Sequence, residues 1–147
     1  MGLEYFTKFE DLMGFIYYDF VKENKYIQYT IDGKNYMYKV FAVYFEEKYN
    51  LDLYHEGNYE VSDIEKFIDL SKKTSFYDFD VDVKDNDKII TLVTCSRFYG
   101  VNDKRQFVVV GRMLRDDEKI ENYEVTETNN YKEIKEKLKG DEEDVEA

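Results

Sequence analysis

The sequence predicts a mainly β domain with a few helices, that is, a β-rich α+β fold or a partial barrel. Residues 88–95 and 106–114 are rich in β-branched side chains and are the two most convincing strands. Residues 26–31 and 36–44 are also β-rich, and an Asp-Gly pair lies between them. That pair predicts a hairpin, because glycine accepts the positive φ that a tight turn requires.

Two segments have helical rather than strand spacing. Apolar side chains recur every three or four positions over residues 6–24, which predicts an amphipathic helix, and Gly14 inside it leaves two shorter helices open as an alternative. A serine and a glutamate with capping-box spacing begin residues 62–73, which we predict to be a second helix. Residues 76–83 alternate loosely and predict a short strand.

Composition excludes several classes of function. The chain has 147 residues with 21 basic and 33 acidic side chains, so its net charge of -12 argues against nucleic acid as a partner. A single cysteine excludes an internal disulfide and a paired-cysteine metal site. We find no apolar run near the roughly 18 residues of a membrane span, and no signal-peptide pattern.

The acidic charge is concentrated near the C-terminus. Residues 116–147 hold 13 acidic and 5 basic side chains, a net charge of -8. We therefore predict a domain over residues 1–115 and an acidic C-terminal extension over residues 116–147. Alternating Glu and Lys predict a short helix over residues 131–139, and residues 140–147 resemble a solvated tail.

The only cysteine lies where two predicted strands meet. Cys95 ends the sequence TLVTC, a nine-residue loop follows, and Arg105 precedes the next strand. If the strands pair antiparallel, Cys95 and Arg105 lie at the same end of the sheet, where the guanidinium would favour the thiolate and could donate to an oxyanion. The alternative is a small buried cysteine and an unrelated surface arginine.

This pattern resembles the catalytic hairpin of sortases, the cysteine transpeptidases of Gram-positive cell surfaces. The FEDL sequence at residues 9–12, the hairpin at residues 26–44 and the helix before TLVTC also resemble class B sortases. The similarity covers roughly residues 6–114. It implies a partial sortase-like β-barrel with an N-terminal helix and a helix inserted before the catalytic strand.

The resemblance also implies roles for individual residues. Cys95 matches the nucleophile that forms a thioacyl enzyme with a sorting signal, and Arg105 matches the arginine that steadies the scissile carbonyl. Thr94 lies in the substrate-binding wall of the family's pocket. Arg97, inside the loop, matches no family role and is interpreted as an exposed charge. The partners implied are a surface protein with a C-terminal sorting motif and a peptidoglycan amine, and no cofactor is needed.

Other family features are not found in this sequence. The family's histidine would fall at or before Met1, and the single histidine, His55, is interpreted as an exposed loop residue. The opening strands and the N-terminal membrane anchor of the family are also missing. We therefore expect an N-terminally truncated sortase: a fragment, a gene model started at an internal Met, or a degenerate copy. By family resemblance the protein would act at the extracellular face of the membrane or in the cell wall.

The expected activity is correspondingly weak. General acid–base help is worth about 10² to 10⁴ in rate, so without the histidine we expect an inactive or weakly active transpeptidase. An incomplete barrel leaves an open sheet edge, which predicts self-association. The alternatives are a non-catalytic peptide-binding remnant and a plain β-rich interaction protein. A Ca²⁺ site in the aspartate run at residues 78–87 is only weakly supported, and we assign no metal.

Overall fold

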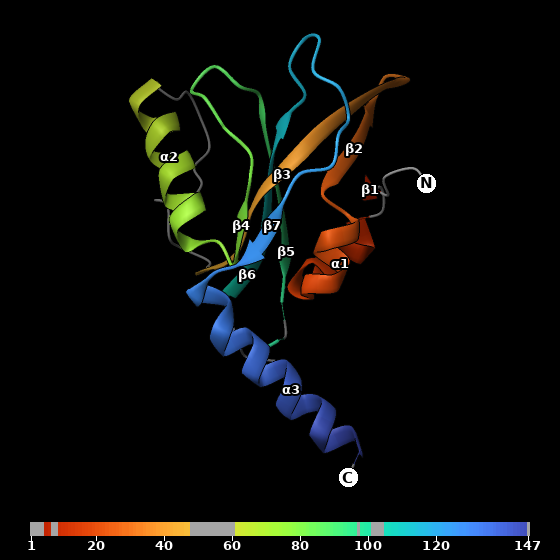
Figure 1. The fold of residues 1–147 in the computed structure, drawn as a ribbon, viewed down its shortest axis with the longest axis vertical. Coiled ribbons are helices and arrows are strands. Elements are labelled where there is room, and N and C mark those ends of the chain that lie inside the picture. The colour runs from red at the N-terminus through yellow and green to blue at the C-terminus, as the bar shows by residue number, and fades with distance from the viewer. Residues whose placement is uncertain (1–4, 7–8, 48–60, 97, 101–104, 147) are drawn as a thin grey trace.

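The structure, a computed structural model, describes residues 5–6, 9–47, 61–96, 98–100 and 105–146. Its main element is a five-stranded sheet in the order β1-β2-β3-β6-β5 (Figure 1). β1 pairs parallel with β2, and the other neighbours in this sheet are antiparallel. The strands are β1 (Tyr5–Phe6), β2 (Tyr26–Ile31), β3 (Lys34–Glu47), β5 (Ile89–Cys95) and β6 (Arg105–Met113). The mainly β fold class is confirmed.

The predicted hairpin is confirmed as β2 and β3. Asp32 and Gly33 form the turn with φ values of 51° and 79°, the left-handed conformation that glycine adopts without a steric cost. β3 extends past both ends of the predicted run because it pairs with β2 first and then with β6. The register between β3 and β6 shifts between Val40 and Ala42, where a bulge bends the strand.

The first predicted helix divides into two, as the alternative had it. A 3₁₀ segment, η1 (Phe9–Ile16), is followed by the short helix α1 (Tyr18–Glu23). A Cβ added at Gly14 would lie only 2.8 Å from the Phe20 ring, so the two pieces pack closely because this residue has no side chain. The second predicted helix is confirmed as α2 (Val61–Thr74), which lies against β3.

A second, two-stranded sheet forms from residues distant in sequence. β4 (Tyr77–Phe79) pairs antiparallel with β7 (Val125–Glu127). β4 is shorter than the predicted strand over residues 76–83, because β7 offers only three residues for pairing. Ser75 and Phe76, just before β4, hydrogen bond to the backbone of Val43, in the part of β3 that extends past its pairing with β2. These bonds join the two sheets.

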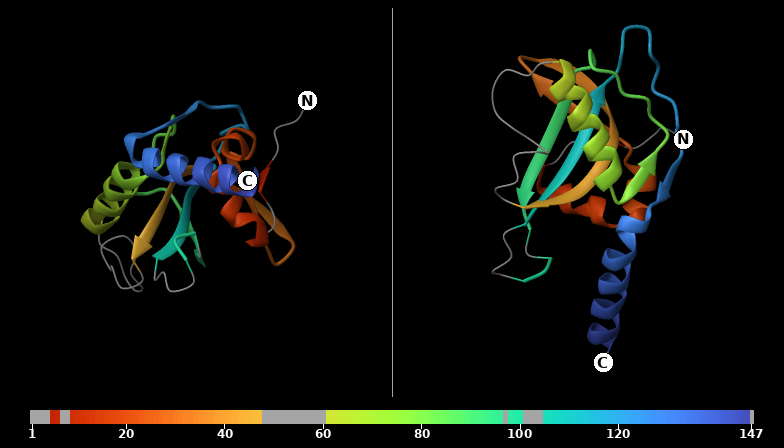
Figure 2. Two further views of the ribbon diagram at one scale, coloured as in Figure 1. Left: turned by 90° about the horizontal axis from the view of Figure 1, so that it is seen from below. Right: turned by 90° about the vertical axis from the view of Figure 1, so that its left-hand side faces the viewer.

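Residues after Arg115 complete the same core. Tyr123, Val125, Tyr131 and Ile134 are all buried in the main hydrophobic cluster. The boundary predicted after Arg115 thus marks a change in charge, while the core continues across it. After the 3₁₀ turn η2 (Asn129–Tyr131), helix α3 (Lys132–Glu146) extends from the body (Figures 1 and 2). It is longer than the predicted helix and includes most of the segment expected to be a tail.

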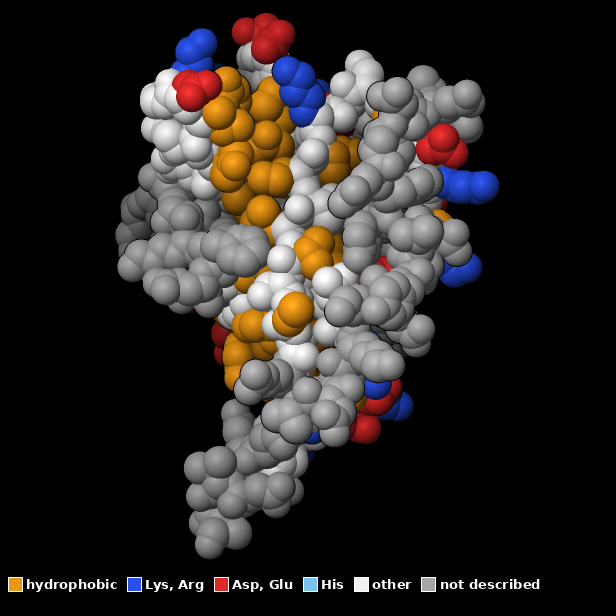
Figure 3. Space-filling model, turned by 180° about the vertical axis from the view of Figure 1, so that it is seen from behind, with side chains coloured by type: hydrophobic (Ala, Val, Ile, Leu, Met, Phe, Trp, Pro, Cys, Tyr) orange, Lys and Arg blue, Asp and Glu red, His pale blue; other side chains and the backbone are white. Residues whose placement is uncertain are grey.

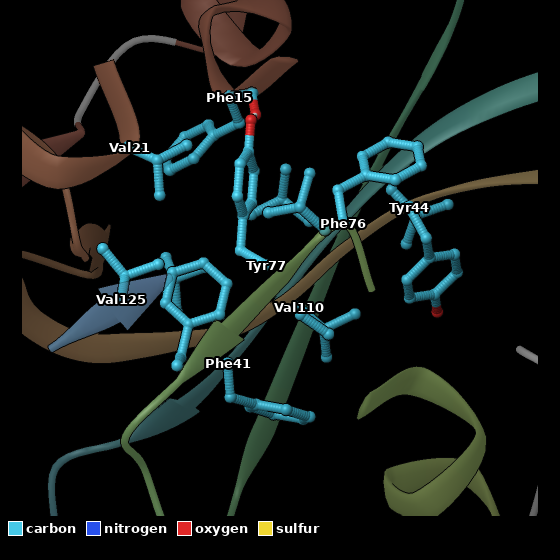
Figure 4. Close-up of a cluster of buried hydrophobic side chains, with 14 of the residues drawn as sticks. Phe15, Val21, Phe41, Tyr44, Phe76, Tyr77, Val110 and Val125 are labelled. Atoms are coloured by element: carbon cyan, nitrogen blue, oxygen red, sulfur yellow. The ribbon is translucent and has the colours of Figure 1, made fainter. Parts of the chain in front are cut away.

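Buried tyrosines tie the N-terminal helices to the C-terminal segment. The Tyr77 hydroxyl donates to the carbonyl of Phe15 at 2.9 Å (Figure 4). The Tyr131 hydroxyl donates to the carbonyl of Ile16 at 2.6 Å. Burial raises the pKa of both tyrosines, so both hydroxyls stay protonated and able to donate. Both bonds hold carbonyls at the C-terminal end of η1.

Candidate functional site

The candidate site lies at the open end of the β5–β6 hairpin. Cys95 is the last residue of β5, and it is exposed and not in a disulfide. Arg105 is the first residue of β6, and the two strands pair antiparallel. The structure therefore brings both residues to the same end of the sheet. The interpretation of Cys95 as a small buried residue does not fit its exposure.

The register of the hairpin separates the two side chains by face. Cys95 lies directly opposite Gln106, and Thr94 lies opposite Phe107. Directly paired residues share a face and successive residues alternate, so Cys95 lies with Gln106, whereas Thr94 and Arg105 lie on the face of Phe107. The residue across from the thiol is thus a glutamine. Cys95 and Arg105 meet at the strand ends without facing each other across the ladder.

Aromatic contacts place Arg105 independently of the register. Its guanidinium carbon lies 3.7 Å from the centre of the Tyr99 ring, and Tyr99 packs on Phe45 with ring centres 5.6 Å apart. Phe45 also contacts Phe107, at 5.4 Å between ring centres. Lys137 of α3 lies over the Tyr99 ring as well, at 5.9 Å. Arg105 therefore belongs to an aromatic cluster whose rings attract cations to their faces.

On the other face, a polar row crosses three strands. Glu46 of β3 is paired with Gln106 of β6, and Gln106 is paired with Cys95 of β5. The Glu46 side chain is buried, with 1% of its surface exposed, and Gln106 is half-buried. Sequence reasoning missed both residues. The available signal was a glutamine just before the apolar residues 107–110, but only the strand register shows which residues lie beside it.

The remaining candidates lie partly outside the described residues. His55 and Arg97 are among the positions that the structure does not describe. Ser96, just after the cysteine, is buried, and its hydroxyl accepts a hydrogen bond from the amide of Phe98 at 3.1 Å. This bond forms the first turn of the loop that carries Phe98 and Tyr99 onto the aromatic cluster.

The aspartate run is held by arginines. Arg115 donates to Asp82 at 3.0 Å and to Asp87 at 2.8 Å. Hydrogen bonding to Arg115 lowers the pKa of Asp82. For Asp87, burial acts to raise the pKa, but the hydrogen bonds to Arg115 and to the Lys84 amide, together with the charges of Arg115 and Arg112, lower it. Within the described part of the chain, no group of three or more His, Cys, Asp or Glu residues is arranged to hold a metal ion.

Within the same described residues, no helix combines the length and the apolar character required to cross a bilayer.

A mainly antiparallel sheet, a helix before the cysteine strand and a hairpin that brings a cysteine and an arginine to one end give the chain a sortase-like fold. Comparison with known proteins supports this assignment, although no family model matches the chain. Sortase B of Staphylococcus aureus (strain NCTC 8325 / PS 47) is 30% identical over 110 residues, which is 74% of this chain and 44% of that protein.

Solved structures give the same result. The crystal structure of Clostridium perfringens sortase B matches with a TM-score of 0.64 and 27% identity, over 73% of this chain and 58% of that one. Sortase B from Listeria monocytogenes matches with a TM-score of 0.59 and 30% identity, over 71% and 55% of the two chains. The chain is therefore a homologue of sortase B, and its sheet has the sortase B fold.

Two further matches are complexes of sortase B, the first of them from S. aureus. One holds sortase B with its substrate and the other holds it with triglycine, each with a TM-score of 0.60 and 25% identity. This chain covers 49% of the length of each. It thus spans about half the length of the relatives that it matches.

Proposed function

We propose that this chain carries out sortase-type cysteine transpeptidation, with Cys95 as the nucleophile. The observation that carries the proposal is the exposed Cys95 thiol at the end of β5, in a hairpin with Arg105, within a homologue of sortase B. A strand end holds the sulfur on a rigid element while leaving it open to a substrate. Cysteine is the most nucleophilic of the common side chains once it is deprotonated.

The reaction exchanges one amide bond for another. The Cys95 sulfur attacks the carbonyl carbon of the scissile peptide bond, the C–N bond breaks, and the departing amine takes up a proton. A thioester then joins the peptide to the enzyme. A second amine attacks this thioester, loses a proton and releases the sulfur, so no oxidant or cofactor is consumed.

Arg105 is proposed to stabilise the oxyanion of each tetrahedral intermediate. A guanidinium has five N–H donors and stays charged throughout the working pH range. Its stacking on Tyr99 at 3.7 Å holds the planar group at the strand end, and the long side chain can extend past that end toward the sulfur. Thr94, half-buried on the same face as Arg105, is proposed to contact the peptide.

The proposed partners are an extended peptide carrying a sorting signal and an amine nucleophile. The substrate complex of S. aureus sortase B and the triglycine complex of sortase B support a peptide donor and a glycine-type acceptor. By the same homology we propose that the amine belongs to peptidoglycan and that the protein works at the cell surface. Without a histidine near Cys95 among the described residues, the expected rate is low, about 10² to 10⁴ below that of a fully equipped site.

Mass spectrometry of the intact protein tests the nucleophile. Incubation with a sorting-signal peptide is expected to yield a thioester adduct on the wild type and none on Cys95→Ala. Iodoacetamide is expected to label Cys95 faster than a model thiol at neutral pH, and Arg105→Ala should slow labelling about two- to fivefold, the effect of one nearby charge. Peptide binding with no adduct, unchanged in Cys95→Ala, would instead indicate a non-catalytic peptide-binding protein.

We also propose self-association through β5. Among the described residues this strand has a partner on one side only, and residues 89–94 are all half-buried even though the strand is mostly apolar. No charge interrupts the strand, and hydrophobic side chains form a stripe on the back of the molecule (Figure 3). Uncharged edge strands of this kind pair with a second copy. Leu92→Lys should turn a dimer into a monomer in sedimentation velocity, whereas a monomeric wild type would refute the proposal.

A further inference from the structure

The residue facing Cys95 across the β-ladder is Gln106, and this pairing has a chemical consequence. Paired residues of an antiparallel ladder have Cα atoms about 4.5 to 5.5 Å apart and share a face. The amide of a glutamine there can reach the sulfur of its partner. An amide offers two N–H donors and one carbonyl acceptor, so it can hydrogen bond to a thiolate or to an adjacent oxyanion.

The position of the row also argues for a functional role. The rest of β6 is filled largely by valine and phenylalanine, and residues 107–110 are fully buried. A buried carboxylate and a half-buried amide beside that apolar segment cost desolvation energy that an apolar pair would avoid. They occur at the end of the strand where the cysteine is exposed, which is where polar groups can act on an incoming carbonyl.

We infer that Gln106 is a positioning residue for the Cys95 sulfur. The amide of Gln106 donates toward the sulfur, or toward the oxyanion that forms beside it, from the opposite face of the sheet to Arg105. The two donors would then approach the reacting atoms from both sides of the strand end. This inference rests on the proposed function only in taking Cys95 as the nucleophile.

The pH profile of Cys95 alkylation tests the juxtaposition directly. A carboxylate introduced by Gln106→Glu should move the midpoint of the iodoacetamide rate profile to higher pH and slow labelling at pH 7 about 3- to 10-fold, whereas Gln106→Lys should move it to lower pH. Gln28→Glu, the same change at the chain's other glutamine, is the matched control and should change labelling less than about 1.5-fold, because β2 is two strands removed from β6. Equal profiles for the Gln106 variants and the wild type would overturn the inference. Circular dichroism of every variant establishes that it is folded.

The same experiments separate this inference from the proposed function. If Gln106→Glu shifts the alkylation profile but no sorting-signal peptide gives a thioester, the Gln106–Cys95 contact is supported and transpeptidation is refuted. If the wild type forms a thioester but the alkylation profile does not shift, the proposed function is supported and the role of Gln106 is refuted.

Discussion

β6 carries an arginine near each end, and the two ends are built differently. Arg112 is buried, with 1% of its side chain exposed, and it donates to both oxygens of Glu118 at 2.6 and 3.0 Å. Its Nε donates to the carbonyl of Asp82 at 2.8 Å. Arg105, at the other end, is half-buried and stacks on Tyr99.

This difference separates stability from chemistry along one strand. A guanidinium enclosed by carboxylates is fully neutralised and fixed, and its contribution is structural. A guanidinium on an aromatic face is oriented while its N–H donors stay within reach of a ligand. We expect substitutions at the Arg112 end to change the free energy of unfolding, and substitutions at the Arg105 end to change the reactivity of Cys95.

The largest expected effect is the loss of Arg112. Arg112→Ala removes a buried guanidinium and leaves the partly buried Glu118 carboxylate with Lys39, at 3.1 Å, as its remaining cation, which should lower the free energy of unfolding by about 3 to 5 kcal/mol. Urea denaturation followed by circular dichroism measures this change. Lys22→Ala removes an exposed ion pair to Asp19 instead and should leave the free energy of unfolding almost unchanged. Similar losses in the two variants would contradict the comparison.

Neutralising Glu118 should lower the free energy of unfolding by less than the loss of Arg112 does. Glu118→Gln keeps one hydrogen-bond acceptor for Arg112 but removes the charge, and we expect a loss of about 1.5 to 3 kcal/mol. The rate of Cys95 alkylation should stay within about 1.5-fold of the wild type, since this end of β6 lies far from the thiol. A large change in alkylation with little change in stability would reverse the assignment of the two ends.

Acid should weaken the Arg112 end progressively. Hydrogen bonding to Arg112 lowers the pKa of Glu118 well below its ordinary value, so the carboxylate binds protons less readily in the folded state than in the unfolded state. Its stabilisation is therefore complete above about pH 5 and declines as the pH falls below the ordinary value near 4.3. The gap in unfolding free energy between wild type and Arg112→Ala should narrow between pH 7 and pH 3. A gap that stays constant with pH would show that the Glu118 carboxylate does not stabilise the fold through Arg112.

The smallest expected effect on stability lies at the Arg105 end. Tyr99→Ala removes the ring under the guanidinium and should cost about 1 kcal/mol or less, while changing the rate of Cys95 alkylation because Arg105 is no longer held. Tyr17→Ala, at a tyrosine that is 53% exposed, is the control and should leave alkylation unchanged. Equal alkylation rates in the two variants would show that Tyr99 does not position Arg105.

Much of the sheet could be predicted from the sequence because its signals are local. The Asp32-Gly33 turn, the β-branched strands and the capping-box helix each follow from a few neighbouring residues. The continuation of the core beyond Arg115 could not be predicted, because Tyr123 and Tyr131 are buried by residues distant in sequence, including hydrogen-bond partners 83 and 115 positions away. Charge alone suggested an extension there.

The candidate site shows the same limit at finer scale. Cys95 and Arg105 at one end of a hairpin follow from the order of strands, and the structure has them there. Which side chains share a face depends on the register, and a shift of one residue exchanges all of them. Nine residues lie between the cysteine and the arginine, and the sequence does not say where the loop begins and ends among them, so the register neighbours Gln106 and Glu46 could not be assigned.

The tyrosine contacts across the core have a consequence for how this protein is made. Tyr123 donates to the carbonyl of Val40 at the bulge of β3, and Tyr131 and Ile134 fill space beneath the first helices. Every strand of the large sheet is therefore synthesised before the C-terminal residues that cover its apolar side chains. The nascent chain holds apolar surface open to water until translation has passed residue 134, and chaperone demand should be greatest in that interval.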